Sequence, residues 1–229
     1  MRKILIALLG VLLVAALAGA GTFAYFSDTE TSTGNTFTAG TLNLQVGTSD
    51  PTSAKIDSST WASNGMKPGD TGNAATWLVQ NTGSLAGDLA IGIGTVTNNE
   101  NTRYEMETAA GDTSDNVGEL SGFLKVAIWL DMDKDGKWDT GDKYLGDNGA
   151  VTTAGSGITD QPLPEAAYAT LDTFSGESYT KTGLGVNIAG NAEMGNFRAE
   201  YNFPSSDSPD DDQTQSDSAV FNITFTLTQ

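Results

Sequence analysis

Residues 124–130 read LKVAIWL, and this short stretch decides the fold class. Leu124, Val126, Ile128 and Leu130 fall on alternate positions. This is the spacing of a β-strand that turns one face to a core and the other face to water. The segment is the strongest candidate in the chain for a central strand of a sheet.

The same alternation recurs along the chain, and turn residues separate the alternating segments. The alternating segments are residues 42–46, 75–79, 89–93, 197–203 and 221–227. The stretches KPGD (67–70), NTGS (81–84) and GDNG (146–149) have the composition of turns. Many half-buried strands with little helix predict an all-β single domain, a jelly roll or β-sandwich made of two packed sheets.

Three further segments depart from the strand pattern. Residues 166–173 predict one short helix. Residues 48–63 and 205–218 are rich in Ser, Thr, Asp and Pro and predict surface loops, and the run Asp210–Asp212 in the second of these is expected to be solvated.

Composition excludes several classes of function. The chain of 229 residues has no cysteine and no histidine, so it lacks disulfides, thiolate chemistry and the HExxH zinc motif. Its net charge of −18 repels phosphate backbones, and we expect no nucleic-acid partner. The same charge favours binding of divalent cations.

The N-terminus reads as a signal peptide. Arg2 and Lys3 precede an apolar run from Ile4 to Leu17, and small residues follow that run. Cleavage after Ala20 or after Ala24 fits these small residues. A retained membrane anchor is the competing interpretation, because the apolar run up to Phe26 is long enough to span a bilayer.

The next stretch, GTFAYFSDTETSTGNTFTAGTLNL (21–44), resembles the N-terminus of the TasA/camelysin family of secreted proteins. The likeness continues in MKPGDTGNAATWLVQNTGSLAGDLAI (66–91). The resemblance implies a jelly-roll fold and export, with cleavage between Ala24 and Tyr25 or just before Phe26. It also implies assembly into extracellular biofilm fibres, and related archaeal subunits form bundling pili.

Assembly in this family is similar to donor-strand complementation, in which the N-terminal strand of one subunit completes the sheet of the next. Residues 26–37 are β-prone and free of proline, but they carry few apolar side chains with which to bury themselves. The alternative from the residues alone is a disordered Thr-rich linker. The candidate self-assembly residues are Phe26, Thr29, Thr31, Thr33 and Phe37.

These assignments give three parts: a signal peptide (1–24), a donor strand with a hinge at Gly40 (25–40) and the jelly-roll domain (41–229). The expected partner is a second copy of the chain in a homopolymer, and an accessory fibre-nucleating protein is a further candidate. After signal cleavage no membrane partner is expected, and the protein is predicted to be secreted to the cell surface or beyond.

The stretch DMDKDGKWDTGD (131–142) has the spacing of a calcium-binding loop. Carboxylates occupy loop positions 1, 3, 5, 9 and 12, Gly136 occupies position 6 for the tight turn, and the Lys137 carbonyl at position 7 is a further ligand. An acidic turn without a bound ion is the alternative. The predicted ligands of a structural Ca²⁺ are Asp131, Asp133, Asp135, Lys137, Asp139 and Asp142.

Three functions remain from the sequence. The first is a structural fibre or pilus subunit with a calcium-stabilised loop. The second is a monomeric surface adhesin, for which Trp61, Trp129 and Trp138 are candidate exposed aromatic residues. The third is a metallopeptidase, the label that some camelysin relatives carry. We expect no enzymatic activity, because a catalytic zinc without histidine or cysteine would need an all-carboxylate site.

Overall fold

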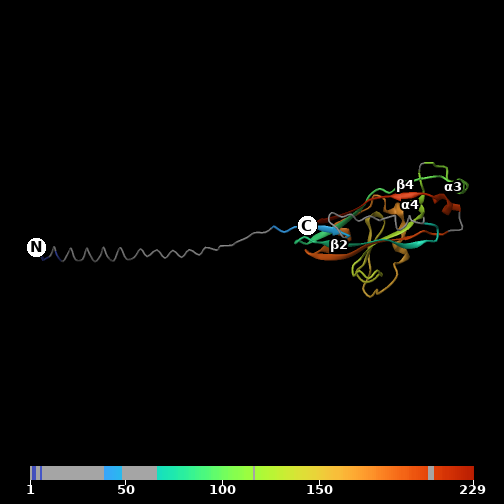
Figure 1. The fold of residues 1–229 in the computed structure, drawn as a ribbon. Coiled ribbons are helices and arrows are strands. Elements are labelled where there is room, and N and C mark those ends of the chain that lie inside the picture. Colours follow the sequence, from blue (N-terminus) through green and yellow to red (C-terminus); the bar gives the residue numbers. More distant parts are fainter. Residues whose placement is uncertain (1, 4–5, 7–38, 48–65, 116, 206–208) are drawn as a thin grey trace. The chain divides into compact units, whose positions relative to one another are not determined.

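Two antiparallel β-sheets form the main body of the protein (Figure 1). The computed structural model describes residues 2–3, 6, 39–47, 66–115, 117–205 and 209–229. The chain divides into two units, Met1–Ala39 and Gly40–Gln229, and every strand described below belongs to the second.

The larger sheet, sheet A, has the strand order β1-β2-β11-β5-β6-β7, with β8 paired to β5. Its two long strands, β2 and β11, pair along almost their whole length. The strands of sheet A are β1 (Leu44–Val46), β2 (Thr71–Asn81), β5 (Lys125–Asp131), β6 (Lys143–Leu145), β7 (Val151–Thr153), β8 (Ala169–Thr170) and β11 (Ala192–Asn202).

The smaller sheet, sheet B, has the order β10-β3-β13, and β9 also pairs with β3. A separate two-stranded ribbon joins β4 to β12. These strands are β3 (Gly87–Ile93), β4 (Thr97–Asn99), β9 (Ser178–Tyr179), β10 (Asn187–Ile188), β12 (Ser218–Val220) and β13 (Ile223–Thr228).

Helices are short and lie between the strands. The α-helices are α3 (Glu105–Ala110), α4 (Leu120–Phe123) and α5 (Lys181–Leu184). The 3₁₀ turns are η1 (Asp147–Gly149), η2 (Glu165–Ala167), η3 (Leu171–Phe174) and η4 (Pro209–Thr214). No helix among the described residues has the length and hydropathy needed to cross a bilayer.

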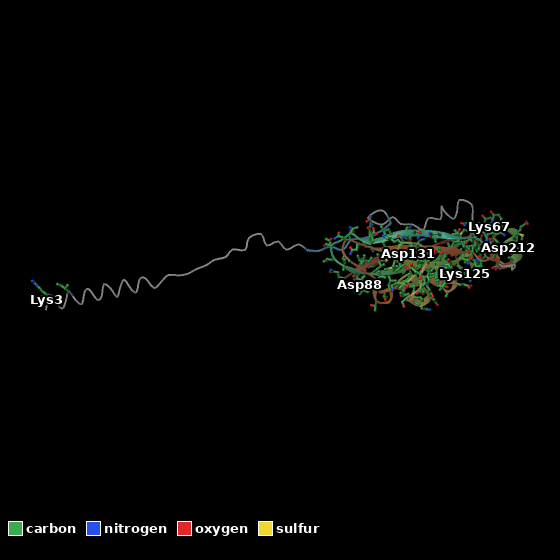
Figure 2. The ribbon with its side chains drawn as sticks, turned by 90° about the horizontal axis from the view of Figure 1, so that it is seen from below. Lys3, Lys67, Asp88, Lys125, Asp131 and Asp212 are labelled. Atoms are coloured by element: carbon green, nitrogen blue, oxygen red, sulfur yellow. The ribbon has the colours of Figure 1, made fainter. Side chains whose placement is uncertain are left out.

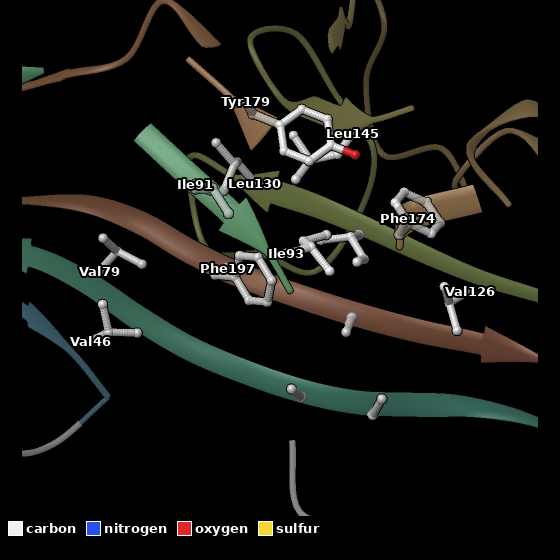
Figure 3. Close-up of a cluster of buried hydrophobic side chains, with 14 of the residues drawn as sticks. Val46, Val79, Ile91, Ile93, Val126, Leu130, Leu145, Phe174, Tyr179 and Phe197 are labelled. Carbon is white, nitrogen blue, oxygen red and sulfur yellow. The ribbon is translucent and has the colours of Figure 1, made fainter. Parts of the chain in front are cut away.

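The two sheets share one hydrophobic core (Figure 3). Val79 and Phe197 come from sheet A, Leu89 and Ile91 come from sheet B, and all four are at most 1% exposed. Phe225 of sheet B meets the Phe197 ring edge-on, with 5.1 Å between ring centroids. The all-β single domain expected from the alternating pattern is confirmed, with the sandwich arrangement of its two sheets.

Asn81, at the end of β2, connects the two sheets through its side chain. It is 1% exposed, and its amide nitrogen donates to the carbonyl oxygens of Leu85, at 2.7 Å, and Ile188, at 3.2 Å. Its side-chain oxygen accepts hydrogen bonds from the backbone of Gly83 and Asn43. Because Ile188 lies in β10 of sheet B, one buried amide bonds across the sandwich.

The KPGD stretch forms the expected turn. The backbone nitrogen of Asp70 donates to the Lys67 carbonyl at 3.0 Å, and Gly69 has a φ of 93°. This left-handed third position is what a type II turn requires of glycine.

Two predictions for the connecting segments are wrong. Residues 166–173 do not form one helix, since η2, β8 and the start of η3 occupy them and bury Leu171 beside Phe174. The second predicted loop, 205–218, contains η4, and its described part packs against α3. The first predicted loop, 48–63, and Trp61 within it lie outside the described residues.

Candidate metal site

The acidic loop 131–142 begins at the last residue of β5 and ends just before β6. Lys134 and Gly136 have positive φ angles of 72° and 80°, so the chain turns tightly within the first half of the loop. A Cβ atom on Gly136 would lie 2.7 Å from a guanidinium nitrogen of Arg198. The backbone conformation at this position therefore favours glycine, and a side chain there would also displace the Arg198 guanidinium.

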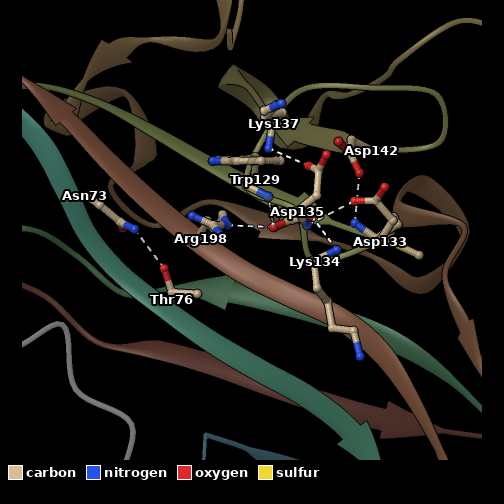
Figure 4. Close-up of polar contacts among 12 residues, drawn as sticks. Asn73, Thr76, Trp129, Asp133, Lys134, Asp135, Lys137, Asp142 and Arg198 are labelled. Carbon is tan, nitrogen blue, oxygen red and sulfur yellow. Dashed lines mark hydrogen bonds and ion pairs between the residues drawn. The ribbon is translucent and has the colours of Figure 1, made fainter. Parts of the chain in front are cut away.

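Three of the predicted ligands lie together. Asp131, Asp133 and Asp135 each offer a carboxylate oxygen within 4.8 Å of the other two. Asp131 is fully buried, whereas the other two are exposed. Figure 4 shows Asp133 and Asp135 in the loop that joins β5 to β6.

Backbone amides of the loop hold these carboxylates in place. Asp131 accepts from the backbone nitrogens of Lys134, at 2.7 Å, and Gly136, at 3.1 Å. Asp135 accepts from the backbone nitrogen of Lys137 at 2.7 Å. The loop conformation thus orients the carboxylates through its own hydrogen bonds.

Arg198 forms an ion pair with the buried carboxylate. Its Nε lies 2.7 Å from Asp131 Oδ2, and its guanidinium carbon lies 5.6 Å from the ring centroid of Trp129. Arg198 pairs with Trp129 across β11 and β5, which sets both groups on one face of sheet A. The guanidinium neutralises one of the loop's carboxylates.

The two C-terminal carboxylates of the loop have different roles. Asp142 is fully buried, and its two oxygens accept from the backbone nitrogens of Met132 and Asp139 at 2.8 and 3.0 Å. Burial raises the pKa of Asp142 to about 6, although these hydrogen bonds oppose the shift. Asp139 instead lies with Asp135 and Asp160, with oxygens of all three within 4.8 Å.

Trp138 is in the interior, which corrects its assignment as an exposed aromatic residue. It is 5% exposed, and Trp129 is 0% exposed. The two rings meet edge-on at 6.4 Å, and Trp138 also forms a two-way backbone bridge with Gln161. Loop position 8 is therefore an apolar anchor of the loop.

Two residues near the loop were missed from the sequence. Asp160 joins the carboxylates of Asp135 and Asp139, and its own carboxylate lies 3.3 Å from Lys137 Nζ. Arg198 is the second, since it supplies the ion-pair partner of Asp131. Neither contact has a sequence signal, because both depend on segments that are distant along the chain.

The loop presents oxygen ligands only. Carboxylates arranged in this way suit a hard divalent cation such as Ca²⁺. The predicted cleavage residues Ala24 and Tyr25, and the predicted self-assembly residues Phe26, Thr29, Thr31, Thr33 and Phe37, lie outside the described residues.

Comparison with known protein families identifies the family of the chain. A family model described as Camelysin metallo-endopeptidase matches residues 1–229, the whole chain, which confirms the resemblance found in the sequence. No curated protein matches the chain.

Proposed function

The chain belongs to the camelysin family, and from this premise we propose that it is a secreted structural subunit that polymerises into extracellular fibres by donor-strand complementation. Residues 25–37 of one subunit would add as a strand to β13 of the next. The observation that carries the proposal is the edge formed by β13.

β13 is the longest of the strands that end either main sheet among the described residues, and the Thr71–Trp77 part of β2 is a second stretch with no strand on its β1 side. Sheet A ends in the three-residue strands β1 and β7, and sheet B ends in the two-residue strand β10 on one side. β13 has six residues and pairs only with β3 within the described chain. Very short edge strands resist pairing with another chain, and a six-residue edge offers a full row of backbone groups to an incoming strand.

The sequence of β13 carries none of the features that usually block an edge. It reads ITFTLT, without lysine, proline or any charge. Ile223, Phe225 and Leu227 face the core but remain partly exposed, whereas Thr224 and Thr226 face outward. A donor strand beside β13 would cover the remaining exposed area of these apolar side chains.

The calcium loop serves this function by stiffening the β5–β6 end of sheet A. Arg198 compensates only Asp131, and Asp133, Asp135 and Asp139 remain without an ion pair among the described residues. A bound Ca²⁺ would relieve the repulsion between them. The proposed role of the ion is structural.

A cross-linking experiment tests the proposed strand pairing. Because the chain has no native cysteine, every disulfide that forms must join introduced cysteines. Thr31→Cys and Thr226→Cys proteins are purified separately, mixed under polymerising conditions and oxidised. We expect heterodimers with a disulfide between the two variants. Thr31→Cys mixed with Thr153→Cys, on the edge strand β7 of sheet A, is the matched control.

Equal cross-linking to both edges, or none to β13, would refute the pairing. Deletion of residues 25–37 provides a second test, since the truncated protein should remain monomeric by electron microscopy. Filaments of normal length from the truncated protein would refute donor-strand assembly altogether.

A metallo-endopeptidase is the second candidate, because the family description carries that activity. The metal implied by that description would have to be held by carboxylates, since the chain has no histidine or cysteine. Such a donor set fits Ca²⁺ and does not fit a catalytic Zn²⁺, which is usually held by histidine or cysteine. Hydrolysis of a fluorescent protein substrate that is abolished by a chelator would favour this candidate.

A further inference from the structure

A second group of acidic side chains lies away from the loop, at the end of the domain formed by β4, α3 and α4 (Figure 1). Glu100 is common to two sets of converging carboxylates, one with Glu107 and Asp217 and one with Asp112 and Glu119. In each set the oxygens lie within 4.8 Å of one another. We call these residues the acidic cluster: Glu100, Glu107, Asp112, Glu119 and Asp217.

The acidic cluster is assembled from segments far apart in the sequence. Glu100 follows β4, Glu107 lies in α3, and Asp112 follows the end of that helix. Glu119 precedes α4, and Asp217 precedes β12, which pairs with β4. Asp212, in the neighbouring η4, marks this end of the domain in Figure 2, and Asp88 marks the other.

Buried carboxylate oxygens of the cluster lack hydrogen-bond partners. Glu107 is 0% exposed and Asp112 is 5% exposed, yet Glu107 Oε1 and Asp112 Oδ2 have no partner. Both oxygens of Glu100 and one each of Glu119 and Asp217 are also buried without a partner. Leaving a buried polar atom unpaired is costly, and for a charged group the cost is larger.

Three carboxylates of the acidic cluster accept hydrogen bonds from backbone nitrogens through one of their two oxygens. Glu107 Oε2 accepts from the Tyr104 backbone, and Asp112 Oδ1 accepts from Ser114 at 2.7 Å. Asp217 Oδ2 accepts from the backbone nitrogens of Glu119 and Leu120. Each of these three carboxylates therefore keeps one buried oxygen without a hydrogen-bond partner among the described residues.

No basic side chain forms an ion pair with the acidic cluster within the described chain. Arg103, which adjoins the cluster in sequence, forms its ion pair with Asp115 at 2.8 Å. Burial first, and then the neighbouring carboxylates, raises the pKa of Glu100 to about 7 and that of Glu119 to about 6. Arg103 acts on the cluster without pairing with it, since its charge lowers the pKa of Glu107 against the larger effect of burial.

The local backbone is shaped to admit Asp217. Gly118 is buried, and a Cβ atom there would lie 2.7 Å from Asp217 Cγ and 2.8 Å from each of its carboxylate oxygens. Any other residue at position 118 would displace this carboxylate. Glycine at position 118 therefore allows the Asp217 carboxylate to lie where it does in the cluster.

We propose that the acidic cluster binds one Ca²⁺ ion, at a site separate from the 131–142 loop. Ca²⁺ accepts six to eight oxygen ligands in flexible geometry, which several carboxylates can supply. Mg²⁺ demands a strict octahedron and retains water, which suits a buried all-protein cage less well. The ion would join α3, α4 and the β4–β12 ribbon into one rigid unit, and this proposal does not depend on fibre formation.

The experiment removes the loop site first. In a protein carrying Asp133→Asn and Asp135→Asn, the melting temperature is measured in EDTA and in Ca²⁺, and bound Ca²⁺ is counted by equilibrium dialysis. At a free concentration about 100 times the dissociation constant, Ca²⁺ should raise the melting temperature by about 5 to 10 °C. One Ca²⁺ should remain bound per chain.

Adding Glu100→Gln and Glu107→Gln to that protein should abolish both the bound ion and the Ca²⁺-dependent shift. In EDTA the same changes should raise the melting temperature, because they remove buried negative charge. Glu105→Gln, an exposed residue of the same helix, is the matched control and should alter neither.

Three results of these measurements would each overturn the proposal, and a fourth concerns stabilisation by acid. They are no Ca²⁺ bound to the loop-disabled protein, an unchanged Ca²⁺ shift after the two cluster substitutions, and an equal loss with Glu105→Gln. If the double substitution prevents folding, Glu119→Gln replaces it, with the same loss of Ca²⁺ expected. Stabilisation of the loop-disabled protein by acid but not by Ca²⁺ would mean that protons alone fill the cluster, which also overturns the proposal.

Discussion

Replacement of Arg198 by methionine tests how charge is balanced in the acidic loop. The substitution keeps an apolar side chain of similar length over Trp129 and removes the guanidinium that lies 2.7 Å from Asp131. Asp131 is 0% exposed, so its carboxylate becomes a buried charge with no ion pair among the described residues.

The expected cost follows from burial. Removing one partner of a buried ion pair destabilises a protein by about 3 to 5 kcal/mol. Asp131 still accepts two backbone hydrogen bonds, which places the expectation at the lower end, about 3 kcal/mol. For a domain of this size such a loss lowers the melting temperature by roughly 6 to 12 °C.

The assay compares unfolding in EDTA with unfolding in saturating Ca²⁺, followed by circular dichroism. An ion held by Asp131, Asp133 and Asp135 replaces the missing positive charge, so the deficit of Arg198→Met should be clearly smaller in Ca²⁺ than in EDTA. By linkage, the variant should also bind Ca²⁺ more tightly than the unmodified protein.

Lys134→Met is the control. Lys134 pairs with Glu193 at the surface, where both side chains are more than 40% exposed, so its removal should cost at most about 1 kcal/mol in either buffer. An equal loss of stability of Arg198→Met in EDTA and in Ca²⁺ would refute the reasoning, because it would show that a Ca²⁺ ion does not replace the positive charge of the Arg198 guanidinium.

Three further predictions concern the acidic cluster and the interior. In EDTA, the free energy of unfolding should fall as pH rises from about 4.5 to about 7, because Glu100 and Glu119 bind their protons more tightly in the folded protein than in the unfolded chain. Urea unfolding curves across this pH range measure the effect, and a free energy of unfolding that does not change with pH would contradict it. Gly118→Ala should lower the melting temperature and weaken Ca²⁺ binding by displacing the neighbouring carboxylate, whereas Gly155→Ala, which has open space around it, should do neither. Trp138→Ala should destabilise the protein by about 3 to 5 kcal/mol in denaturant titrations, and a change below about 1 kcal/mol would place that ring outside the core.

Alternation with period two predicted the long strands, because burial of one face leaves a direct mark on the sequence. β13 is the clearest case, with Ile223, Phe225 and Leu227 facing the core between exposed threonines. β5 obeys the rule less strictly, since every residue from Val126 to Asp131 is buried. Its second face carries Trp129, which packs under Trp138 of the acidic loop.

The acidic cluster could not be predicted from the sequence. Its members span residues 100 to 217, with no fixed spacing between them. They meet only because β12 pairs with β4 and because α3 packs against η4. The loop 131–142 was visible because its carboxylates lie at regular spacing within twelve residues, and local spacing does not depend on the fold.

The buried amide of Asn81 has a consequence for how the protein opens. Its hydrogen bonds reach the Leu85 and Ile188 carbonyls, so neither sheet can separate from the other at this end without breaking them. Segments coupled in this way are expected to open as one cooperative unit, so that their amide hydrogens report one common free energy of opening in hydrogen exchange. Around Asn81 we therefore expect both sheets to open together, and not a single strand to fray.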